Sequence, residues 1–244
     1  MRRRPFLNIG GKMPITLGYL GGMIMLLDGI ENTLTGHDTN ITTWVDLSKN
    51  GNDLIIPVPA KTTIGSNYVW LNPTSITDLT AMSIIGGLKI NNGIVNQFDE
   101  FTIEMRFEVG QSISGVYRII VNADNSPDLI AYIYGNTNNG TLYTRAGGSQ
   151  ISSGLIIYPT LVTISFTYKK ATNTVKMYMN GVLFNTQTNI PTNFENIFNS
   201  KLYFGDFASL GAATIIKYYS MRIYPFVLTD QEIADNYQND MNRF

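Results

Sequence analysis

The stretch of residues 162–187 constrains the fold more than any other part of the sequence. In residues 162–168 every second side chain is apolar, and the residues between them are Thr or Ser. This alternation is typical of a strand with one buried face, because successive side chains point to opposite sides. A second alternating run, residues 175–179, is followed by Asn-Gly at 180–181, which favours a type I′ hairpin turn. We therefore predict hairpin strands in a sheet with one buried and one polar face, and we expect function on the polar face or in its loops.

Short strands of the same kind recur along the chain. Residues 101–109 alternate without interruption, and turns rich in Gly, Asn and Pro separate the other apolar runs. Further strands are expected at residues 118–121, 129–134, 142–145, 202–205 and 215–224. In the last of these, the alternation predicts a shared face for Ile215, Lys217, Tyr219, Met221 and Ile223.

The end of the chain predicts a short helix. Pro225 ends the last strand, and residues 229–232 have the Thr-x-x-Glu pattern of a capping box, in which each of the two side chains bonds a backbone amide of the first turn. Ile233, Tyr237 and Met241 then recur at every fourth position. This spacing indicates an amphipathic helix with one apolar stripe.

Length and composition favour a single sandwich domain. The chain has 244 residues, enough to bury a large core, and no internal repeat indicates a second domain. We divide it into a basic N-terminal arm, residues 1–16, and one β-sandwich domain, residues 17–244. A net charge of -1 without a basic patch argues against a nucleic-acid partner. Because cysteine is absent, disulfides and thiolate chemistry are excluded.

The N-terminal arm begins with the basic residues Arg2, Arg3 and Arg4, followed by Phe6. The apolar run at residues 15–27 has no small-residue cleavage pattern after it, which argues against a signal peptide. The run is also shorter than the roughly 20 residues that cross a membrane, so we expect no membrane partner. We interpret the arm as an assembly segment that docks on another protein.

Four sequence motifs point to a known family. Residues 26–54 contain LDGIENT, GH and TTWVDLSKNGNDL, residues 101–104 read FTIE, and residues 178–181 read YMNG. The chain ends in RIYPFVLTDQEIADNYQNDMNRF. Together these motifs resemble laminin G-like domains of the concanavalin A-like lectin/glucanase superfamily, with Lys49 where Gly is usual. The resemblance covers most of the chain from about residue 26 onward. It implies an all-β fold: an antiparallel β-sandwich, a jelly roll of concanavalin A-like type, with a short C-terminal helix.

The superfamily includes glucanases, so the chain must be tested for a catalytic acid pair. Retaining glycosidases need two carboxyl groups about 5 to 5.5 Å apart. Glu104 and Glu108 share a strand face, but four residues separate them by about 13 Å. Arg106 stands between them, where the glucanases place an Asp. We interpret the three residues as an exposed salt-bridge ladder and predict that the protein is not an enzyme, with no catalytic residues.

One loop holds oxygen ligands that suit calcium. Asp46, Asn50, Asn52 and Asp53 lie close together in the sequence, and relatives of this fold often hold structural calcium. Asx residues also form turns by bonding their own backbone, which is the interpretation we favour. A single histidine, His37, and no cysteine argue against zinc, and we expect His37 to make a loop hydrogen bond. We therefore predict no cofactor and no metal site, with structural calcium as the alternative.

A ligand-binding platform is predicted on the hairpin around residues 129–145. If Ile133 faces the core, its neighbours on the strand face outward, beside the next strand across an Asn-Gly turn. Aromatic rings and Asn or Arg side chains are the groups that hold sugars. The alternative is that the aromatic residues are ordinary cross-strand partners. The predicted ligand-binding residues are Tyr132, Tyr134, Asn138, Asn139, Tyr143 and Arg145.

These observations favour a non-enzymatic, lectin-like protein. Chains without cysteine that are rich in Asn, Thr and Gly resemble bacteriophage virion components such as fibres, tail-tip proteins or capsid decorations. We expect a virion surface component that binds carbohydrate or a host surface, forms a homo-oligomer and contacts other virion proteins through its arm. The alternatives are a structural packing subunit that binds no sugar, or an adhesin on a bacterial surface. An active glycosidase is the function we favour least.

Overall fold

The computed structural model describes most of the chain from residue 22 onward. The described segments are residues 22–56, 62–72, 82–84, 88–90, 93–95, 97–110, 116–122, 129–135, 139–146, 149–157, 160–190, 202–205 and 215–244. Between residues 116 and 157 the description covers the backbone of the strands and the side chains of Ile119 and Thr141. The arm residues Arg2, Arg3, Arg4 and Phe6 and the predicted domain boundary after residue 16 lie outside the described part. Among the described residues, no helix is long and apolar enough to cross a membrane.

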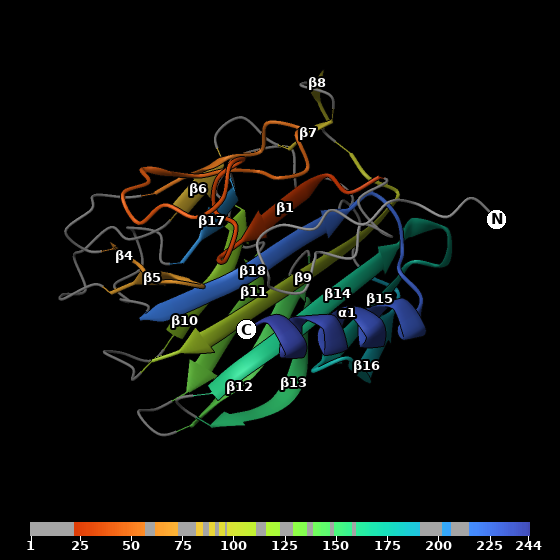
Figure 1. The fold of residues 1–244 in the computed structure, drawn as a ribbon. Helices are drawn as coiled ribbons and strands as arrows, with labels where there is room; N and C mark the ends of the chain where they lie inside the picture. The colour runs from red at the N-terminus through yellow and green to blue at the C-terminus, as the bar shows by residue number, and fades with distance from the viewer. Residues whose placement is uncertain are drawn as a thin grey trace.

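Two antiparallel sheets form the body of the protein (Figure 1). We call the first the helix-side sheet, with strand order β16-β15-β14-β9-β18-β5-β4 and β1 also paired to β18. Its strands are β1 (Met25–Asp28), β4 (Thr62–Ile64), β5 (Val69–Leu71), β9 (Glu100–Val109), β14 (Thr160–Lys169), β15 (Thr174–Met179), β16 (Val182–Thr188) and β18 (Ile216–Tyr224). A 3-10 turn, Lys170–Thr172, joins β14 to β15.

The second sheet, here the opposite sheet, has the order β13-β12-β11-β10-β17-β6-β3-β2. Its strands are β2 (Thr43–Trp44), β3 (Leu54–Ile55), β6 (Met82–Ile84), β10 (Val116–Asn122), β11 (Leu129–Gly135), β12 (Asn139–Ala146), β13 (Ser149–Ile157) and β17 (Leu202–Phe204). A small separate ribbon pairs β7 (Lys89–Ile90) with β8 (Gly93–Ile94). The predicted antiparallel β-sandwich with one C-terminal helix is therefore confirmed.

The core lies between the two sheets and is built by the predicted alternation. On β14 the apolar residues Val162, Ile164, Phe166 and Tyr168 are all at most 2% exposed and join the main core cluster. The opposite sheet contributes fully buried side chains such as Trp44. Each large apolar side chain removed from water in this way contributes about 1.5 to 3 kcal/mol, so the alternating strands explain why the two sheets stack.

The strand β18 departs from its predicted face. A β-bulge between Tyr218 and Ser220 shifts its register against β9. Ile216 and Tyr218 face the core before the bulge, and Met221 and Ile223 face it after the bulge. The prediction that residues 215–223 keep one alternating face is wrong, because a bulge adds a residue and changes the side to which the following side chains point.

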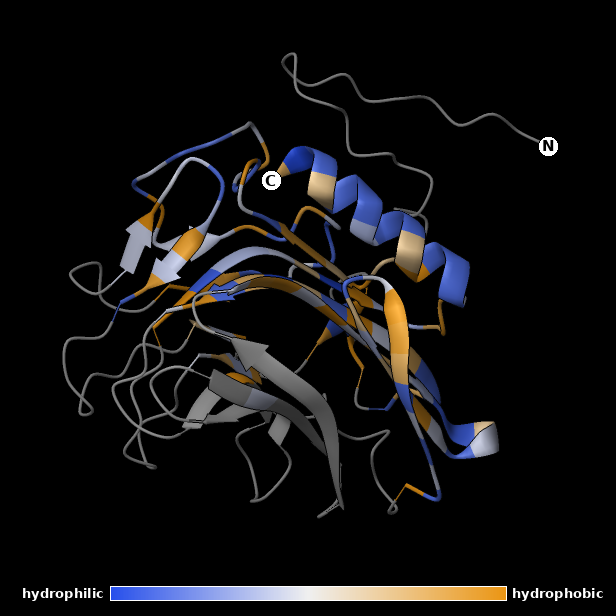
Figure 2. Ribbon diagram, turned by 90° about the horizontal axis from the view of Figure 1, so that it is seen from below, coloured by the Kyte–Doolittle hydropathy of each residue, from blue (hydrophilic) through white to orange (hydrophobic). Residues whose placement is uncertain are grey.

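The C-terminal helix α1 (Asp230–Arg243) lies on the outer side of the helix-side sheet (Figure 2). The capping box is confirmed: Thr229 Oγ1 accepts from the Glu232 amide at 3.2 Å, and the Glu232 carboxylate accepts from the Thr229 amide at 2.8 Å. The buried helix residues are Ile233, Asn236 and Asp240, whereas Met241 is 49% exposed. The predicted apolar stripe is therefore correct at its first residue and wrong at Met241.

The outer face of the sheet explains this difference. Thr163, Ser165 and Thr167 of β14 are polar, as predicted, but each is at most 3% exposed because this part of the face lies under α1. Polar side chains of the helix meet polar side chains of the sheet here. The face is polar, as predicted, but it is buried where the helix lies.

The Asn180-Gly181 hairpin turn is confirmed. The two residues have φ of 52° and 78°, the positive values that a type I′ turn requires. Gly181 also lies against the helix: a Cβ placed on it would be 3.0 Å from the Tyr237 Cβ and 3.2 Å from the Ala234 Cα. Glycine is therefore needed at this position both for its backbone conformation and for the close approach of α1.

Candidate functional site

The helix α1 covers only part of the outer face of the helix-side sheet. Its 14 residues span about 21 Å, whereas the 10 residues of β9 span about 33 Å. Figure 1 shows β9 and β18 continuing past the C-terminal end of α1. The outer face therefore has two zones, one buried under the helix and one open beyond its end.

The covered zone holds a buried polar cluster around Glu104. This carboxylate accepts hydrogen bonds from Asn236 at 2.8 Å and from Tyr224 and Ser165, each at 3.3 Å. Arg222 Nη1 lies 3.8 Å from it. Burial raises the pKa of Glu104 to about 7, against the opposing effect of the Arg222 charge. The carboxyl group is thus partly protonated at neutral pH and is closed off from any substrate.

Two ion pairs fasten the helix over this cluster. Arg222 of β18 forms a two-pronged pair with Asp240 of α1, in which Nη1 donates to Oδ2 at 2.9 Å and Nη2 donates to Oδ1. Arg243, in the last turn, pairs with the fully buried Asp28 of β1. Bidentate guanidinium–carboxylate pairs are geometrically specific, so they set the position of α1 on the sheet.

The predicted salt-bridge ladder of Glu104, Arg106 and Glu108 is wrong. Glu104 and Arg106 are each 2% exposed, under or beside the helix. Glu108 lies in the open zone, where its carboxylate accepts hydrogen bonds from Lys217 at 3.1 Å and from the Tyr219 hydroxyl at 2.9 Å. The sequence spacing placed the three residues on one face correctly, but it held no information about which part of that face is covered.

The open zone carries a group of aromatic side chains around one ion pair. Lys217 Nζ lies 5.4 Å from the ring centroid of Tyr68 and 5.5 Å from that of Trp70. The Tyr219 ring packs edge-on at 5.8 Å from the Tyr68 ring and 5.8 Å from the Phe244 ring. We call this group the aromatic platform; its members are Tyr68, Trp70, Glu108, Lys217, Tyr219 and Phe244.

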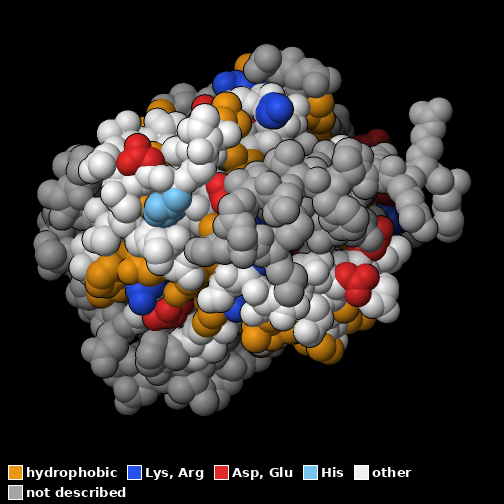
Figure 3. Space-filling view, viewed as in Figure 1, with side chains coloured by type: hydrophobic (Ala, Val, Ile, Leu, Met, Phe, Trp, Pro, Cys, Tyr) orange, Lys and Arg blue, Asp and Glu red, His pale blue; other side chains and the backbone are white. Residues whose placement is uncertain are grey.

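Strand pairing places these residues side by side. Lys217 of β18 lies opposite Glu108 of β9 on one side and opposite Trp70 of β5 on the other. The next residue in the same row, Thr63 of β4, is exposed and lies opposite Trp70. Figure 3 shows hydrophobic side chains around one basic and one acidic side chain over the ends of β5 and β18. Most members of the platform therefore come from neighbouring strands of one sheet.

The chemistry of the platform suits a ligand with both apolar and hydroxylated faces. Tyr68, Trp70 and Phe244 are partly exposed, and the Lys217 ammonium lies over the Tyr68 and Trp70 rings. The side chains of Glu108 and Lys217 are each 26% exposed and supply an acceptor and a donor at the edge of the rings. Burial and the hydrogen bond to Glu108 raise the pKa of Tyr219, so its hydroxyl stays protonated as a donor to that carboxylate.

The sequence contained a signal for this platform. In residues 68–71 the aromatic residues Tyr68 and Trp70 alternate with the buried Val69 and Leu71. The period of two in a short strand places both aromatic side chains on the face away from the core. What the sequence did not show is that β18 lies beside β5 and so brings Lys217 and Tyr219 to these aromatic residues, since that depends on the order of strands in the sheet.

The predicted platform on β11 and β12 stays a prediction. The backbone confirms the hairpin, with Tyr132 opposite Tyr143 and Tyr134 opposite Thr141. Arg145, further along β12, lies opposite Gln150 of β13. Asn138 lies outside the described residues, and Asn139 begins β12. The strand pairing thus brings the two tyrosines Tyr132 and Tyr143 to one register position.

In the loop that was the alternative site for calcium, the Asp and Asn side chains form hydrogen bonds with the backbone. Asp46 Oδ1 accepts from the amides of Leu26 and Ser48, each at 2.9 Å. Asn52 spans the loop, with its amide nitrogen donating to the Ile24 carbonyl at 2.8 Å and its amide oxygen accepting from the Lys89 amide at 2.7 Å. The Ser48–Asp46 bond is a local turn of the kind that the sequence favoured, whereas the other three bonds join the loop to segments distant in the sequence. Within the described residues, no group of three or more His, Cys, Asp or Glu side chains is placed to hold a metal ion.

The single histidine also makes a local contact. His37 Nδ1 lies 3.1 Å from the Ile30 carbonyl oxygen, which confirms the predicted loop hydrogen bond. Because a carbonyl only accepts, the ring nitrogen carries the proton in this contact. His37 is exposed and lies in the loop that precedes β2.

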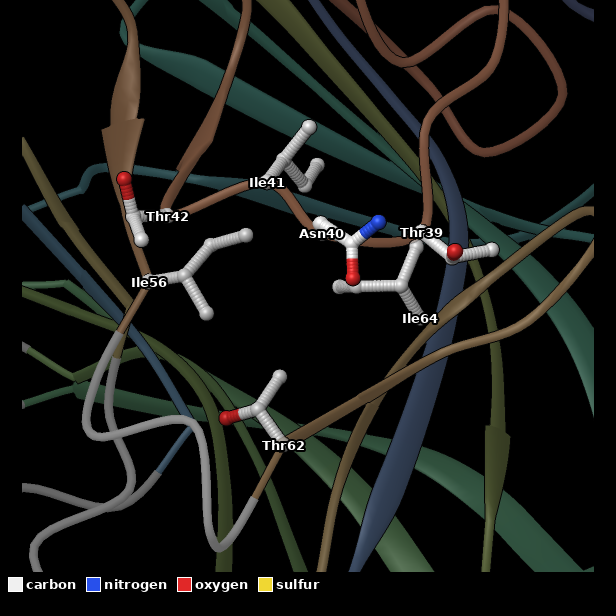
Figure 4. A pocket seen from close by; sticks show the side chains of 7 residues that line it. All are labelled: Thr39, Asn40, Ile41, Thr42, Ile56, Thr62 and Ile64. Carbon is white, nitrogen blue, oxygen red and sulfur yellow. The ribbon is translucent and has the colours of Figure 1, made fainter.

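A small groove opens between the loop before β2 and strand β4 (Figure 4). Its volume is about 240 Å³, below the roughly 300 to 1,000 Å³ of typical ligand pockets. It is lined by Thr39, Asn40, Ile41, Thr42, Ile56, Thr62 and Ile64. Isoleucine and threonine side chains give it no charge and no aromatic ring, so the aromatic platform is the stronger candidate site.

Comparison with known proteins gives a fold but no family. No protein-family model matches the sequence, and no curated protein matches it. Solved structures do match: a Trypanosoma rangeli sialidase in complex with sialic acid has a TM-score of 0.66 at 13% identity, covering 91% of this chain and 34% of that one. The botulinum neurotoxin type G receptor-binding domain has a TM-score of 0.58 at 14% identity, covering 90% of this chain and 51% of that one.

The receptor-binding domain of botulinum neurotoxin D is similar in the same way, with a TM-score of 0.62 at 13% identity and coverage of 91% of this chain and 54% of that one. The chain therefore spans between 34% and 54% of the length of these structures. At such identities the likeness concerns the fold. The protein is an antiparallel β-sandwich.

Proposed function

We propose that this chain is a non-enzymatic, lectin-like module that binds carbohydrate through the aromatic platform. The observation that carries the proposal is the partly exposed aromatic platform, in which Tyr68 and Trp70 flank the Lys217–Glu108 pair. A sugar ring has an apolar C–H face that stacks on aromatic rings and hydroxyl groups that bond to charged side chains. Sites for small ligands combine apolar walls with a few placed polar groups in this way.

The environment of the acid residues supports a non-enzymatic role. Glu104 is 2% exposed and bonded to Asn236 under α1. Glu108 is held by Lys217 and Tyr219. A glycosidase of the glucanase kind needs two carboxyl groups on either side of one bond, and these two residues lie in different zones of the face.

The proposed place of action is the surface of a virion. The support is the resemblance of the sequence to laminin G-like domains and its cysteine-free, Asn- and Thr-rich composition. In this proposal residues 1–16 dock on other virion proteins, the sandwich projects outward as a homo-oligomer, and the ligand is a glycan of the host surface. Deletion of residues 1–14 should abolish incorporation into particles while circular dichroism shows an intact sandwich. Normal incorporation of the truncated protein would contradict the docking role.

The carbohydrate proposal is tested with the full chain on a glycan array. Trp70→Ala should weaken binding at least tenfold, because removal of a central aromatic contact costs about 2 kcal/mol or more. Tyr143→Ala, in the other predicted platform, is the matched control and should bind like the wild type. Loss of binding in Tyr143→Ala with retention in Trp70→Ala would move the site to the β11–β12 hairpin.

A structural packing subunit is the second candidate function. The observation that favours it is the edge strand β16, where Val182 is 68% exposed and Leu183 is 38% exposed. An edge strand offers unpaired backbone groups to a neighbouring chain. A blank array with folded protein, together with normal assembly, would favour this role over carbohydrate binding.

A further inference from the structure

Arg106 is a buried cation that forms no ion pair with any of the described residues. The residue is 2% exposed, and none of the ion pairs among the described residues includes it. Nη1 donates to the Thr163 hydroxyl at 3.0 Å, and Nε is buried without a hydrogen-bond partner. Burial lowers the pKa of Arg106. A buried charge of this kind is costly, and such groups are normally paired.

The two neighbouring cations are compensated, which distinguishes Arg106 from them. Arg222 is paired with Asp240, and Lys217 is paired with Glu108. The charge of Asp240 also acts on Arg106, but both oxygens of this carboxylate are bonded to Arg222. A guanidinium with free N–H groups is left for an anion from outside the chain.

The flexible side chain of Met241 contacts Arg106. Its Nη2 contacts the sulfur of Met241 at 3.3 Å, and Met241 is 49% exposed in the last turns of α1. A thioether is a weak acceptor, and a methionine side chain has three rotatable bonds. Rotation of Met241 would therefore release Nη2 from this contact at little cost in hydrogen bonding.

Arg106 lies next to the aromatic platform. It is two residues from Glu108 on the same face of β9, a distance of about 6.6 Å along the strand. Tyr219 connects the two positions, since its hydroxyl donates to Glu108 and its ring belongs to the platform. A sugar ring stacked on the platform can thus extend a substituent toward Arg106.

We infer that the ligand is an acidic glycan, whose ring stacks on the aromatic platform while its anionic group displaces Met241 and binds the guanidinium of Arg106. This inference rests on the proposed carbohydrate function and adds the substrate class. The anionic group is a carboxylate or a sulfate. A carboxylate presents two oxygens in a plane and a sulfate presents three. A guanidinium can bind two oxygens of either group through two parallel hydrogen bonds.

The test measures binding of matched glycans by titration calorimetry with the full chain. Each oligosaccharide of the glycan-array set is used in a neutral, a carboxylated and a sulfated form, with lactose, 3′-sialyllactose and 3′-sulfolactose among them. The wild type should bind at least one acidic form at least tenfold more tightly than its neutral form. The carboxylated and sulfated arms distinguish the two sources of charge.

Arg106→Met should remove this preference and leave binding of the neutral form unchanged. Its free energy of unfolding should equal or exceed that of the wild type, because a buried guanidinium whose Nε has no hydrogen-bond partner is replaced by an apolar chain of similar length. If Arg106 served only to stabilise the structure, its replacement would instead lower the free energy of unfolding. Met241→Ala, which keeps Arg106 and uncovers it, should bind the acidic form several-fold more tightly and the neutral form as before.

Three outcomes decide the matter. Equal affinity of the wild type for neutral and acidic forms would overturn the inference and leave the carbohydrate proposal standing. Binding of no member of the set would overturn both proposals. An acidic preference that survives Arg106→Met in a folded protein, or that Met241→Ala fails to strengthen, would assign the charge recognition to another residue and overturn the inference.

Discussion

At the scale of single residues, Glu104 makes the stability of the protein depend on pH. Its pKa is about 7 in the folded protein and 4.5 in its ordinary state. Between these values the unfolded chain has released the proton and the folded protein retains it. Stability therefore falls as pH rises from 4.5 to about 7 and then levels off, with a total loss of about 3 kcal/mol from this group.

Glu104→Gln should remove this dependence. The amide keeps the size of the side chain and imitates the protonated acid, so the variant should match the wild type near pH 5. Near pH 8 it should be more stable, by up to about 3 kcal/mol. Chemical denaturation across this pH range measures the difference.

The matched control is Glu100→Gln, at the other end of the same strand. Glu100 pairs with Lys169 at 3.0 Å, and its side chain is 37% exposed. This variant should keep the pH dependence of the wild type. A Glu104→Gln protein that loses stability at pH 8 would show that the charged carboxylate helps to hold α1 on the sheet.

At the scale of elements, the β15–β16 turn and helix α1 depend on each other. Gly181→Ala forces a side chain into positive φ and places its Cβ 3.2 Å from the Ala234 Cα, a backbone atom of the helix. The left-handed conformation alone costs a residue with a side chain about 1 to 2 kcal/mol, and the contact adds to it. The variant should lose at least about 2 kcal/mol of stability, and amides of α1 should exchange faster with solvent.

Gly93→Ala is the control for a glycine without this constraint. Its nearest contact for an added Cβ is the Ile90 carbonyl oxygen at 3.4 Å, an ordinary distance. We expect the unfolding midpoint of Gly93→Ala to stay within error of the wild type. If Gly181→Ala unfolds like Gly93→Ala, α1 moves freely relative to the turn and the close packing is unimportant.

The same two elements show how far the sequence could predict the structure. The turn at Asn180 and the helix start at Thr229 were predictable because their signals are local backbone chemistry. The burial of Ser165 and Glu104 was not, because it depends on a helix more than 60 residues later in the chain. The helix docks through the polar residues Asn236 and Asp240 as well as Ile233, so a search for an apolar stripe finds only part of the docked face.

The candidate site was predictable in part for the same reason. The outward direction of Tyr68 and Trp70 follows from the period of a strand. Their meeting with Lys217 follows from the order of strands in the sheet, which no single stretch of sequence contains. Arg106 was found by its position between two glutamates, yet the sequence suggested pairing with them. The register of β9 instead gives Glu104 and Glu108 other partners.

At the scale of the whole molecule, polar contacts connect the two sheets in addition to the apolar core. The Tyr218 hydroxyl of the helix-side sheet donates to the Ile119 carbonyl of the opposite sheet at 2.7 Å. Trp44 of the opposite sheet donates through Nε1 to the Asp28 carbonyl of β1 at 3.0 Å. Both contacts are buried, so neither sheet can separate without exposing unpaired backbone groups. The sandwich should therefore unfold as one unit.

The two tryptophans test this cooperativity, because one lies in each sheet. Trp70→Phe leaves Trp44 as a fluorescent reporter of the opposite sheet, and Trp44→Phe leaves Trp70 as a reporter of the helix-side sheet. Within each variant, the fluorescence and circular dichroism transitions in urea should coincide, as expected for two-state unfolding.

Adding Tyr218→Phe to either variant should lower its free energy of unfolding by about 1 to 2 kcal/mol. The slope of this free energy against urea concentration should stay the same. A Trp70 transition that precedes the dichroism change would show that the helix-side sheet opens alone, and the aromatic platform would then rest on a movable layer.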